Sequence, residues 1–245
     1  MAVTTALGAA MPPARAAGHQ HPLRVLAIVA HELRSPLASI TGTLVTLRQR
    51  GEQLGPAERD ELLELAIAQA GRLDRLIGQL LVAAAPATTA PPAGRVVDAA
   101  RLARDAVRLA ALADPTRAFA LEVPDALWVR ADADAVHGVL ANLLGNAAKH
   151  TPDRTPVWVQ ASRRGRVAVV AVEDAGPGIP VGARRRIFQP FQRLHPAEGQ
   201  AGGVGLGLYV ARRLARAQAG ELLAVDPVRS QRGARFELYL PMADR

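Results

Sequence analysis

The chain has 245 residues, of which 49% are hydrophobic and only 3% aromatic, so it can bury a core that must be largely aliphatic. It has no cysteine, which excludes disulfides, cysteine zinc sites and iron–sulfur clusters. Its net charge of +8 comes from scattered basic residues, and no apolar run reaches the ~20 residues that span a bilayer. We therefore predict a cytoplasmic protein with no nucleic-acid partner and no membrane insertion.

The N-terminal half of the chain carries helical heptad patterns. Residues 1–21 are rich in Ala, Gly, Pro and Thr and predict a disordered arm. Two apolar rows then follow along a first helix, and two more follow along a second helix after a break at residues 51–56. The rows are Leu26, Leu33, Ile40 and Leu47 with Ala30, Leu37 and Leu44, then Leu62, Gln69 and Leu76 with Ala66, Leu73 and Leu80.

These rows predict an antiparallel helical hairpin over residues 22–85. A lone hairpin leaves half of each seam exposed, so two hairpins are expected to pair as a dimeric four-helix bundle. The alternative is that the seam packs on the rest of the same chain.

A Pro- and Ala-rich linker over residues 86–94 separates the hairpin from a second domain over residues 95–245. Mixed strand and helix patterns there predict an α+β fold, with a sheet covered by helices on one face. The predicted strands lie near 97 and over 119–123, 128–130, 157–162, 167–172, 222–225 and 235–240, and the predicted helices end near 112 and cover 134–149 and 204–217.

Residues 31–37 (HELRSPL) place a histidine beside a carboxylate within the first helix. The imidazole of His31 can attack phosphorus if its other nitrogen loses a proton, and Glu32 is the adjacent group that can accept it. Pro36 removes a backbone N–H and crowds the carbonyl four residues back. The segment is therefore a candidate nucleophilic site.

Residues 142–152 (NLLGNAAKHTP) place Asn142, Asn146 and Lys149 on one helix face, at spacings of four and three. Amide oxygens suit Mg²⁺, which keeps several waters and bridges phosphates. Lys149 is the only lysine of the chain, and it can add a point charge for phosphate.

Two glycine-rich loops follow. Residues 173–180 (EDAGPGIP) end an apolar strand, where a carboxylate can accept a hydrogen bond from adenine and glycines let backbone approach the base. Residues 202–208 (GGVGLGL) precede a helix, where backbone N–H groups can hold phosphate. Between them, residues 186–193 hold two of the four phenylalanines, and the polar stretch 194–201 is interpreted as a lid over nucleotide.

These five blocks, in this order, resemble the bacterial sensor histidine kinases of two-component systems. The resemblance covers residues 23–241 and matches the H box, N box, first glycine box, F box and second glycine box. It implies a dimerisation and histidine phosphotransfer hairpin followed by a GHKL-type α/β sandwich that binds ATP. It further implies Mg²⁺–ATP as cofactor, and a response regulator receiver domain whose aspartate accepts the phosphoryl group.

Carried over residue by residue, the resemblance makes His31 the phosphorylated nucleophile and Glu32 its base. Asn146 would hold Mg²⁺, Asn142 and Lys149 would contact phosphate, Asp174 would bind adenine and His150 would stack against it. The glycines that would shape the pocket and lid are Gly176, Gly178, Gly203, Gly205 and Gly207.

The sequence departs from the family pattern in three ways. Ser35 stands where many relatives have Thr or Asn, which leaves dephosphorylation of the regulator open as a second activity, and His150 stands where an aromatic residue is common. Residues 1–21 hold no sensor domain, so the input is expected to come from an unknown partner. Two alternative functions are a catalytically silent dimeric scaffold that binds a response regulator, and another GHKL ATPase.

Overall fold

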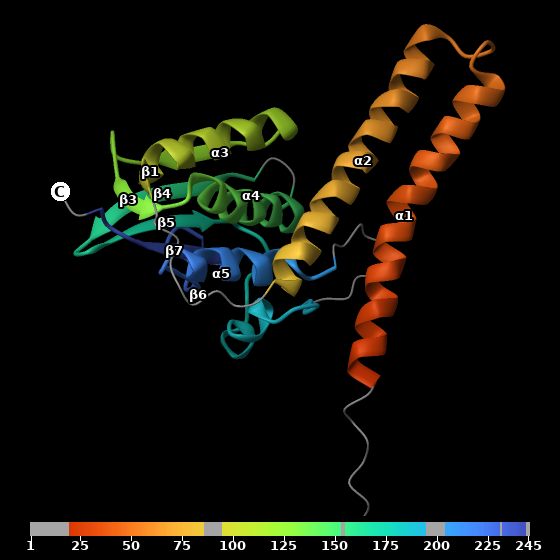
Figure 1. Ribbon diagram of the computed structural model, residues 1–245. Coiled ribbons are helices and arrows are strands. Elements are labelled where there is room, and N and C mark those ends of the chain that lie inside the picture. The colour runs from red at the N-terminus through yellow and green to blue at the C-terminus, as the bar shows by residue number, and fades with distance from the viewer. Residues whose placement is uncertain (1–19, 86–94, 153–154, 195–203, 231, 244–245) are drawn as a thin grey trace, which may run out of the picture.

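The computed structural model describes residues 20–85, 95–152, 155–194, 204–230 and 232–243 (Figure 1). The predicted linker and nearly all of the predicted arm lie outside these residues. Two long antiparallel helices, α1 (Gln20–Arg50) and α2 (Pro56–Ala84), form the hairpin. Helix α2 starts where Pro56 follows Gly55, whose N–H donates to the Glu58 carboxylate at 2.8 Å.

Within the hairpin, the predicted apolar rows of α1 are only partly covered by α2. Pro36 and Thr43 are buried against α2, whereas Leu37 and Leu44, in the second predicted row, are 54% and 51% exposed. Helix α2 buries Ala66 and Leu76. It leaves exposed a second apolar stripe that the predicted rows do not contain, namely Leu63, Ile67, Ile77 and Leu81. The single hairpin therefore keeps apolar surface on both helices.

The rest of the described chain is an α/β sandwich. Its elements are β1 (Arg95–Asp98), α3 (Ala99–Ala113), β2 (Phe119–Glu122), β3 (Trp128–Ala131), α4 (Ala133–His150), β4 (Val157–Arg164), β5 (Val167–Glu173), η1 (Val181–Ala183), η2 (Arg186–Phe188), α5 (Gly207–Ala217), β6 (Glu221–Val225) and β7 (Arg235–Pro241). The main sheet has the order β2-β4-β5-β7-β6, in which only β2 and β4 are parallel, while β1 pairs with β3 separately.

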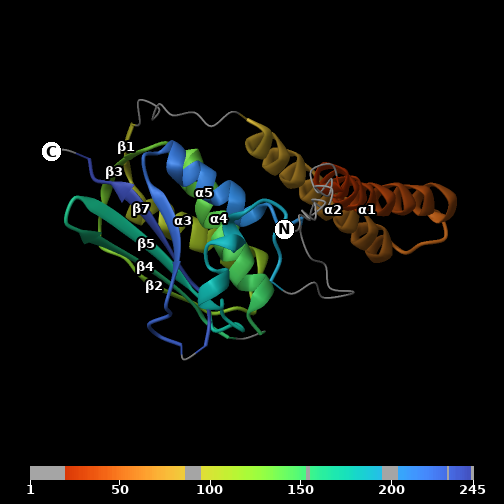
Figure 2. The same cartoon turned by 90° about the horizontal axis from the view of Figure 1, so that it is seen from below.

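Helices α3, α4 and α5 cover one face of the main sheet, as Figure 2 shows from below. This arrangement confirms the predicted α+β fold. The last helix begins at Gly207, three residues later than predicted. Residues 204–206 instead belong to the loop before it, where Gly205 has a φ of +76° that cannot continue a helix.

The core between sheet and helices is aliphatic, as the composition predicts. Strand β5 alternates Ala168, Val170 and Val172 toward the helices, and α4 contributes Leu140 and Leu143. Asp98 and Asp132 start α3 and α4 by accepting hydrogen bonds from backbone N–H groups of the first turn. Within the described residues, no helix combines the length and apolar character that crossing a membrane requires.

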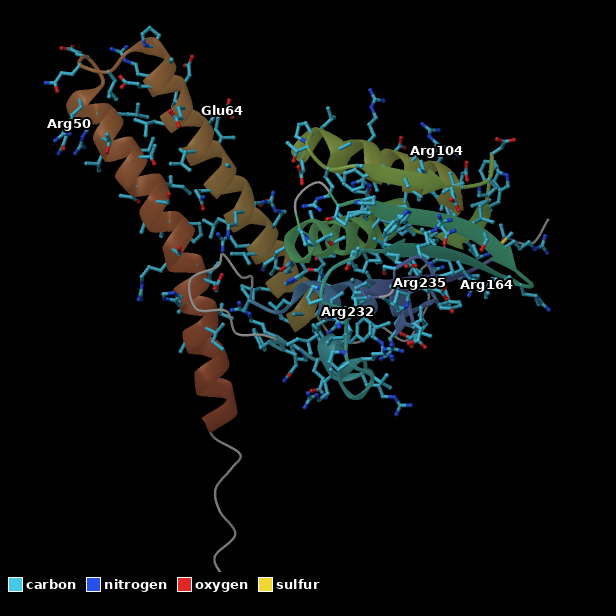
Figure 3. All side chains as sticks on the ribbon, turned by 180° about the vertical axis from the view of Figure 1, so that it is seen from behind. Arg50, Glu64, Arg104, Arg164, Arg232 and Arg235 are labelled. Carbon is cyan, nitrogen blue, oxygen red and sulfur yellow. The ribbon has the colours of Figure 1, made fainter. Side chains whose placement is uncertain are left out.

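The other face of the sheet carries a network of ion pairs. Arg164 and Arg235, both labelled in Figure 3, each contact Glu237, at 2.9 and 3.1 Å. Arg235 also contacts Glu173, which is 1% exposed, at 2.9 Å. Glu173 in turn accepts hydrogen bonds from the backbone N–H groups of residues 228–230. The end of β5 is thereby fixed against the loop that precedes β7.

Candidate functional site

The histidine segment lies on α1. His31 and Ser35 are exposed and one helical turn apart, so both are accessible from solvent. Glu32 is half-buried, and its carboxylate forms an ion pair with Arg72 of α2 at 3.4 Å. The pair ties the two helices together at the level of the histidine segment.

The asparagine face lies on α4. The side chain of Asn142 donates from Nδ2 to the Gly138 carbonyl at 2.8 Å, and its Oδ1 accepts from Gln79 of α2 at 3.1 Å. Asn146 follows one turn later and is half-buried. Partial burial and the nearby Arg193 guanidinium lower the pKa of Lys149, while the Glu32 carboxylate opposes this shift. The Lys149 ammonium therefore interacts electrostatically with charged groups of the hairpin as well as of the sandwich.

The predicted adenine end lies just beyond β5. Asp174 is 5% exposed, and its Oδ1 accepts hydrogen bonds from the N–H groups of Gly176 at 2.8 Å and Ala234 at 3.2 Å. Burial raises the pKa of the Asp174 carboxyl, although these two hydrogen bonds oppose the shift. A Cβ on Gly176 would lie 2.6 Å from the His150 carbonyl oxygen. Only glycine fits there, and this close contact brings the end of α4 against the first glycine loop.

The second glycine loop is tied to the phenylalanine segment. Phe191 donates its N–H to the Gly205 carbonyl at 3.0 Å, and Phe188 packs edge-on against Phe236 with ring centroids 6.3 Å apart. Gly207 begins α5, and Gly178 lies in the first loop with a φ of +80°. Gly203 and most of the predicted lid lie outside the described residues.

The phosphate-binding face predicted on the sandwich is turned toward the hairpin. Residues Leu76 of α2 and Val204, Leu206 and Val210 of the sandwich form one buried cluster. Apolar side chains of α1 on either side of His31 pack against this cluster; they are Ile28, Val29 and Leu33. The alternative that part of the hairpin seam packs on the same chain is therefore realised at this level.

The structure brings together Asn142, Asn146 and Lys149 on one helix, with α5 and the second glycine loop beside it. Asp174 and Gly176 lie against His150, the last residue of this helix, directly after Lys149. His31, Glu32 and Ser35 lie on the hairpin, across the contact with the sandwich. The predicted site residues are therefore divided between the hairpin and the sandwich.

Sequence reasoning missed three residues that shape this site. Arg117 is buried and donates to the carbonyls of Ala148 at 3.0 Å and Pro152 at 3.3 Å, which holds the end of α4 in place. Glu173 anchors the strand end before Asp174, and Gln79 contacts Asn142. Their partners lie 31 to 63 residues away along the chain. Short sequence motifs do not predict contacts between residues that are so far apart in the chain.

The residues present fit ATP and a single magnesium ion. The described residues contain no group of three or more His, Asp or Glu side chains that could hold a metal on its own. Amide oxygens on α4 suit Mg²⁺ when the nucleotide phosphates and water supply the remaining ligands. At the other part of the predicted site, the Asp174 carboxylate is buried, and the backbone of Gly176 lies close to it and to the His150 carbonyl.

Comparison with known families agrees with this geometry. Residues 23–85 match the His Kinase A (phospho-acceptor) domain, and residues 131–244 match the histidine kinase-, DNA gyrase B- and HSP90-like ATPase family. The chain is 33% identical over 216 residues to a probable sensor histidine kinase, TcrY, of Mycobacterium tuberculosis, covering 87% of this chain. It is 36% identical over 228 residues to the adaptive-response sensory kinase SasA of a Synechocystis species, covering 89% of this chain.

Solved structures give the same result. ShkA, in a crystal structure of the full-length protein with AMPPNP, superposes over 91% of this chain and 46% of its own, with a TM-score of 0.63 and 26% identity. The mycobacterial sensor histidine kinase MprB matches 60% of this chain and 97% of its own, with a TM-score of 0.54 and 26% identity. The fold and site define a phospho-acceptor hairpin joined to a GHKL ATPase domain.

The chain therefore belongs to the sensor histidine kinases of two-component systems and contains their catalytic core. It spans 45% of the length of TcrY and 59% of that of SasA.

Proposed function

We propose that this chain is an ATP-dependent protein-histidine kinase that phosphorylates His31 and passes the phosphoryl group to an aspartate of a response regulator receiver domain. The observation that carries the proposal is the contact between hairpin and sandwich. The helix turns on both sides of His31 pack against the cluster that contains Val204 and Leu206 of the second glycine loop. A phosphate donor bound at that loop would be presented to the hairpin segment that carries the nucleophile.

The chemistry at His31 follows from its surroundings. One imidazole nitrogen attacks the γ-phosphorus, the bond to the ADP oxygen breaks, and the other ring nitrogen releases its proton. Glu32 is the adjacent carboxylate assigned to accept this proton, and its ion pair with Arg72 of α2 at 3.4 Å holds it between the two helices. The exposed position of His31 also lets a regulator reach the phosphorylated ring.

The nucleotide roles are assigned to the sandwich. We assign Asp174 and His150 to adenine, Asn142 and Lys149 to phosphate, and Asn146 to Mg²⁺, which would neutralise charge on the phosphates when bound. The pocket and lid are assigned to Gly176, Gly178, Gly203, Gly205 and Gly207. Support comes from the buried Asp174 carboxylate and from the close backbone contact at Gly176.

The partners follow from the same proposal. The exposed apolar faces of α1 and α2 fit a homodimer through residues 22–85. Ser35 lies one turn from His31 and is assigned to orient water during dephosphorylation of the regulator. A kinase of this type draws on cytoplasmic ATP, and its stimulus would reach the hairpin through an upstream partner.

The nucleophile can be tested by labelling with γ-labelled ATP. Wild-type protein should acquire label that is lost in acid and retained in alkali, as phosphohistidine is. His31→Gln should abolish labelling and change nucleotide affinity by no more than a few-fold, because the pocket lies on the sandwich. His137→Gln, a half-buried histidine of α4, serves as the matched control and should keep the label.

Any of three results would contradict the proposal. Acid-labile label in the His31→Gln variant would place the phosphoryl group elsewhere. Acid-stable label in the wild type would point to a serine kinase, and ATP binding without any label would point to a scaffold or ATPase.

A further inference from the structure

The face of the main sheet that α3, α4 and α5 leave uncovered carries a groove. Its volume is about 1390 Å³, and it is bordered by β3, by the turn between β4 and β5, and by the end of β7. Val169 and Ala171, which alternate with the helix-facing residues of β5, lie in it. Sites for small molecules usually have about 300–1,000 Å³. The groove is therefore large enough for a segment of polypeptide chain.

Arginine side chains dominate the groove. Of the residues that line it, five are arginines and one, Glu122, is acidic. We call it the arginine groove, after Arg130, Arg163, Arg164, Arg166 and Arg235.

Two of these arginines are neutralised within the sheet. Arg164 contacts Glu237 at 2.9 Å, and Arg235 contacts both Glu237 at 3.1 Å and Glu173 at 2.9 Å. The one acidic lining residue, Glu122, is paired with Arg229. These contacts balance two arginines of the groove and its one carboxylate.

The other three arginines leave an excess of positive charge. Arg130, Arg163 and Arg166 are exposed, and none of them forms an ion pair with a carboxylate of the described residues. Arg163 donates to the Gly165 carbonyl at 2.9 Å, which leaves its charge uncompensated. Three guanidinium groups thus face solvent without a counterion from the described part of the chain.

Backbone hydrogen bonds hold these arginines at one end of the sheet. Met242 donates its N–H to the Arg166 carbonyl at 3.1 Å, and Ala243 donates to the Trp128 carbonyl at 3.0 Å. The turn before β5 and strand β3 therefore lie on either side of the chain that leaves β7. Trp128, which also lines the groove, is 52% exposed there, two residues before Arg130.

This combination of side chains fits an acidic polypeptide. The guanidinium fork matches a carboxylate with two parallel hydrogen bonds, and Arg and Trp are enriched among the residues that contribute most to protein interfaces. Between the arginines, the groove has uncharged polar and apolar residues such as Ser162, Gln160 and Pro124. A nucleic acid would favour a continuous basic stripe instead.

We propose that the arginine groove docks an acidic segment of a partner protein, with Arg130, Arg163 and Arg166 pairing with its carboxylates and Trp128 packing against it. The nucleotide site is assigned to α4, α5 and the loop after β5, on the other face of the sheet. The turn at Arg166 precedes β5, whereas Asp174 follows the other end of this strand. Partner and nucleotide can therefore be bound at the same time, and the inference does not depend on the proposed phosphate roles.

Binding of an acidic peptide to the full chain tests the proposal. The probe is a fluorescein-labelled peptide of ten glutamates, followed by anisotropy at 0.15 M salt, where distant surface charges are largely screened. Arg130→Gln/Arg166→Gln should weaken binding at least ten-fold and leave affinity for an ATP analogue unchanged. Arg48→Gln/Arg50→Gln removes the same charge at the far end of the hairpin, where Figure 3 labels Arg50, and should change peptide affinity less than two-fold.

Two competition experiments complete the test. Excess ATP should not displace the peptide, since the two sites lie on opposite faces of the sheet. A single-stranded DNA of ten nucleotides, which carries similar charge, should bind more weakly than the peptide.

Several outcomes would overturn the proposal. A wild-type chain that does not bind the peptide lacks the docking site, and equal losses in the two double variants would mean that only net charge matters. Displacement by ATP would place the peptide in the nucleotide site, and tighter binding of the DNA would make the groove a nucleic-acid site. None of these results would bear on phosphorylation of His31, which the labelling experiment tests separately.

Discussion

At the scale of single residues, burial of the charged Asp174 carboxylate lowers the stability of the folded chain at neutral pH. The carboxyl lies almost completely inside the protein, and burial raises its pKa despite two hydrogen bonds from backbone N–H groups. A raised carboxyl pKa means that the folded chain binds this proton more tightly than the unfolded chain does. Stability therefore declines as pH rises from about 3.8, the ordinary value, through the raised pKa of the folded state.

We expect Asp174→Asn to separate stability from binding. The amide oxygen can still accept from Gly176 and Ala234, so the fold should be kept and should be at least as stable at neutral pH. Nucleotide binding should fall by about 10- to 150-fold, because a hydrogen bond to a charged group, worth about 1.5–3 kcal/mol, is lost. Denaturation at several pH values measures the stability of the variant, and titration with an ATP analogue measures its nucleotide affinity.

The prediction for Asp174 has two possible contradictions. Wild-type affinity in the asparagine variant would remove the residue from the adenine site. A large loss of stability at neutral pH would mean that the carboxylate charge supports the fold, contrary to its raised pKa.

At the scale of elements, helix α5 is positioned by a carboxylate on the neighbouring strand. Glu221 begins β6 and accepts from Arg212 at 2.8 Å, in the middle of α5, and from Arg216 at 3.0 Å, in its last turn. Burial opposes ionisation, but these guanidinium contacts lower the pKa of Glu221 to about 2. Because α5 starts at the second glycine loop, this contact also orients the loop.

The lowered pKa predicts a pH dependence with a definite sign. The contribution of Glu221 to stability is complete above its ordinary pKa of 4.5 and is lost as pH falls toward about 2. Glu221→Gln should lower the free energy of unfolding at pH 7 by about 1 kcal/mol or less, since the partly exposed pair is screened by solvent. Its difference from the wild type should vanish near pH 2.

Urea denaturation across pH 2 to 7 provides this measurement. Glu64→Gln is a suitable control, because Glu64 is exposed on α2 and lies far from α5, as Figure 3 shows. A constant difference between wild type and Glu221→Gln across this pH range would contradict the ionic origin of the effect.

At the scale of the whole molecule, the hairpin retains apolar surface that the chain itself does not cover. Leu44 on α1 and Ile67 on α2 are 51% and 63% exposed, although the sandwich buries a full aliphatic core. A cluster with part of the sandwich covers only the end of the hairpin near Leu76. A second copy, packed in a four-helix bundle, would cover the remainder.

We therefore expect the full chain to be a dimer, and we expect a charged substitution in the exposed apolar surface of the hairpin to weaken it. Ile67→Glu should weaken association at least ten-fold, because it would bury an unpaired carboxylate at the interface. Sedimentation over a range of protein concentrations measures this. Val181→Glu, an exposed position on the sandwich, should leave the dimer intact. A monomeric wild-type chain would contradict the dimer directly.

The sequence by itself determined the elements, the order of the motifs and the family. Heptad spacing marked the hairpin, alternation marked the sheet, and the grouping of Asn142, Asn146 and Lys149 on one face follows from helical periodicity alone. Glycine motifs were informative because they mark close backbone approach, as Gly176 shows against the His150 carbonyl. These are all consequences of local geometry, which short patterns record.

Only the tertiary structure decided which partners these residues have. The Glu32 carboxylate meets Arg72, 40 residues away, and the Asn142 amide meets Gln79, 63 residues away. The exposed stripe on α2 also depends on how whole elements pack. Hydrogen bonds and burial between distant segments arise from the arrangement of the hairpin against the sandwich, and no local spacing in the sequence encodes that arrangement.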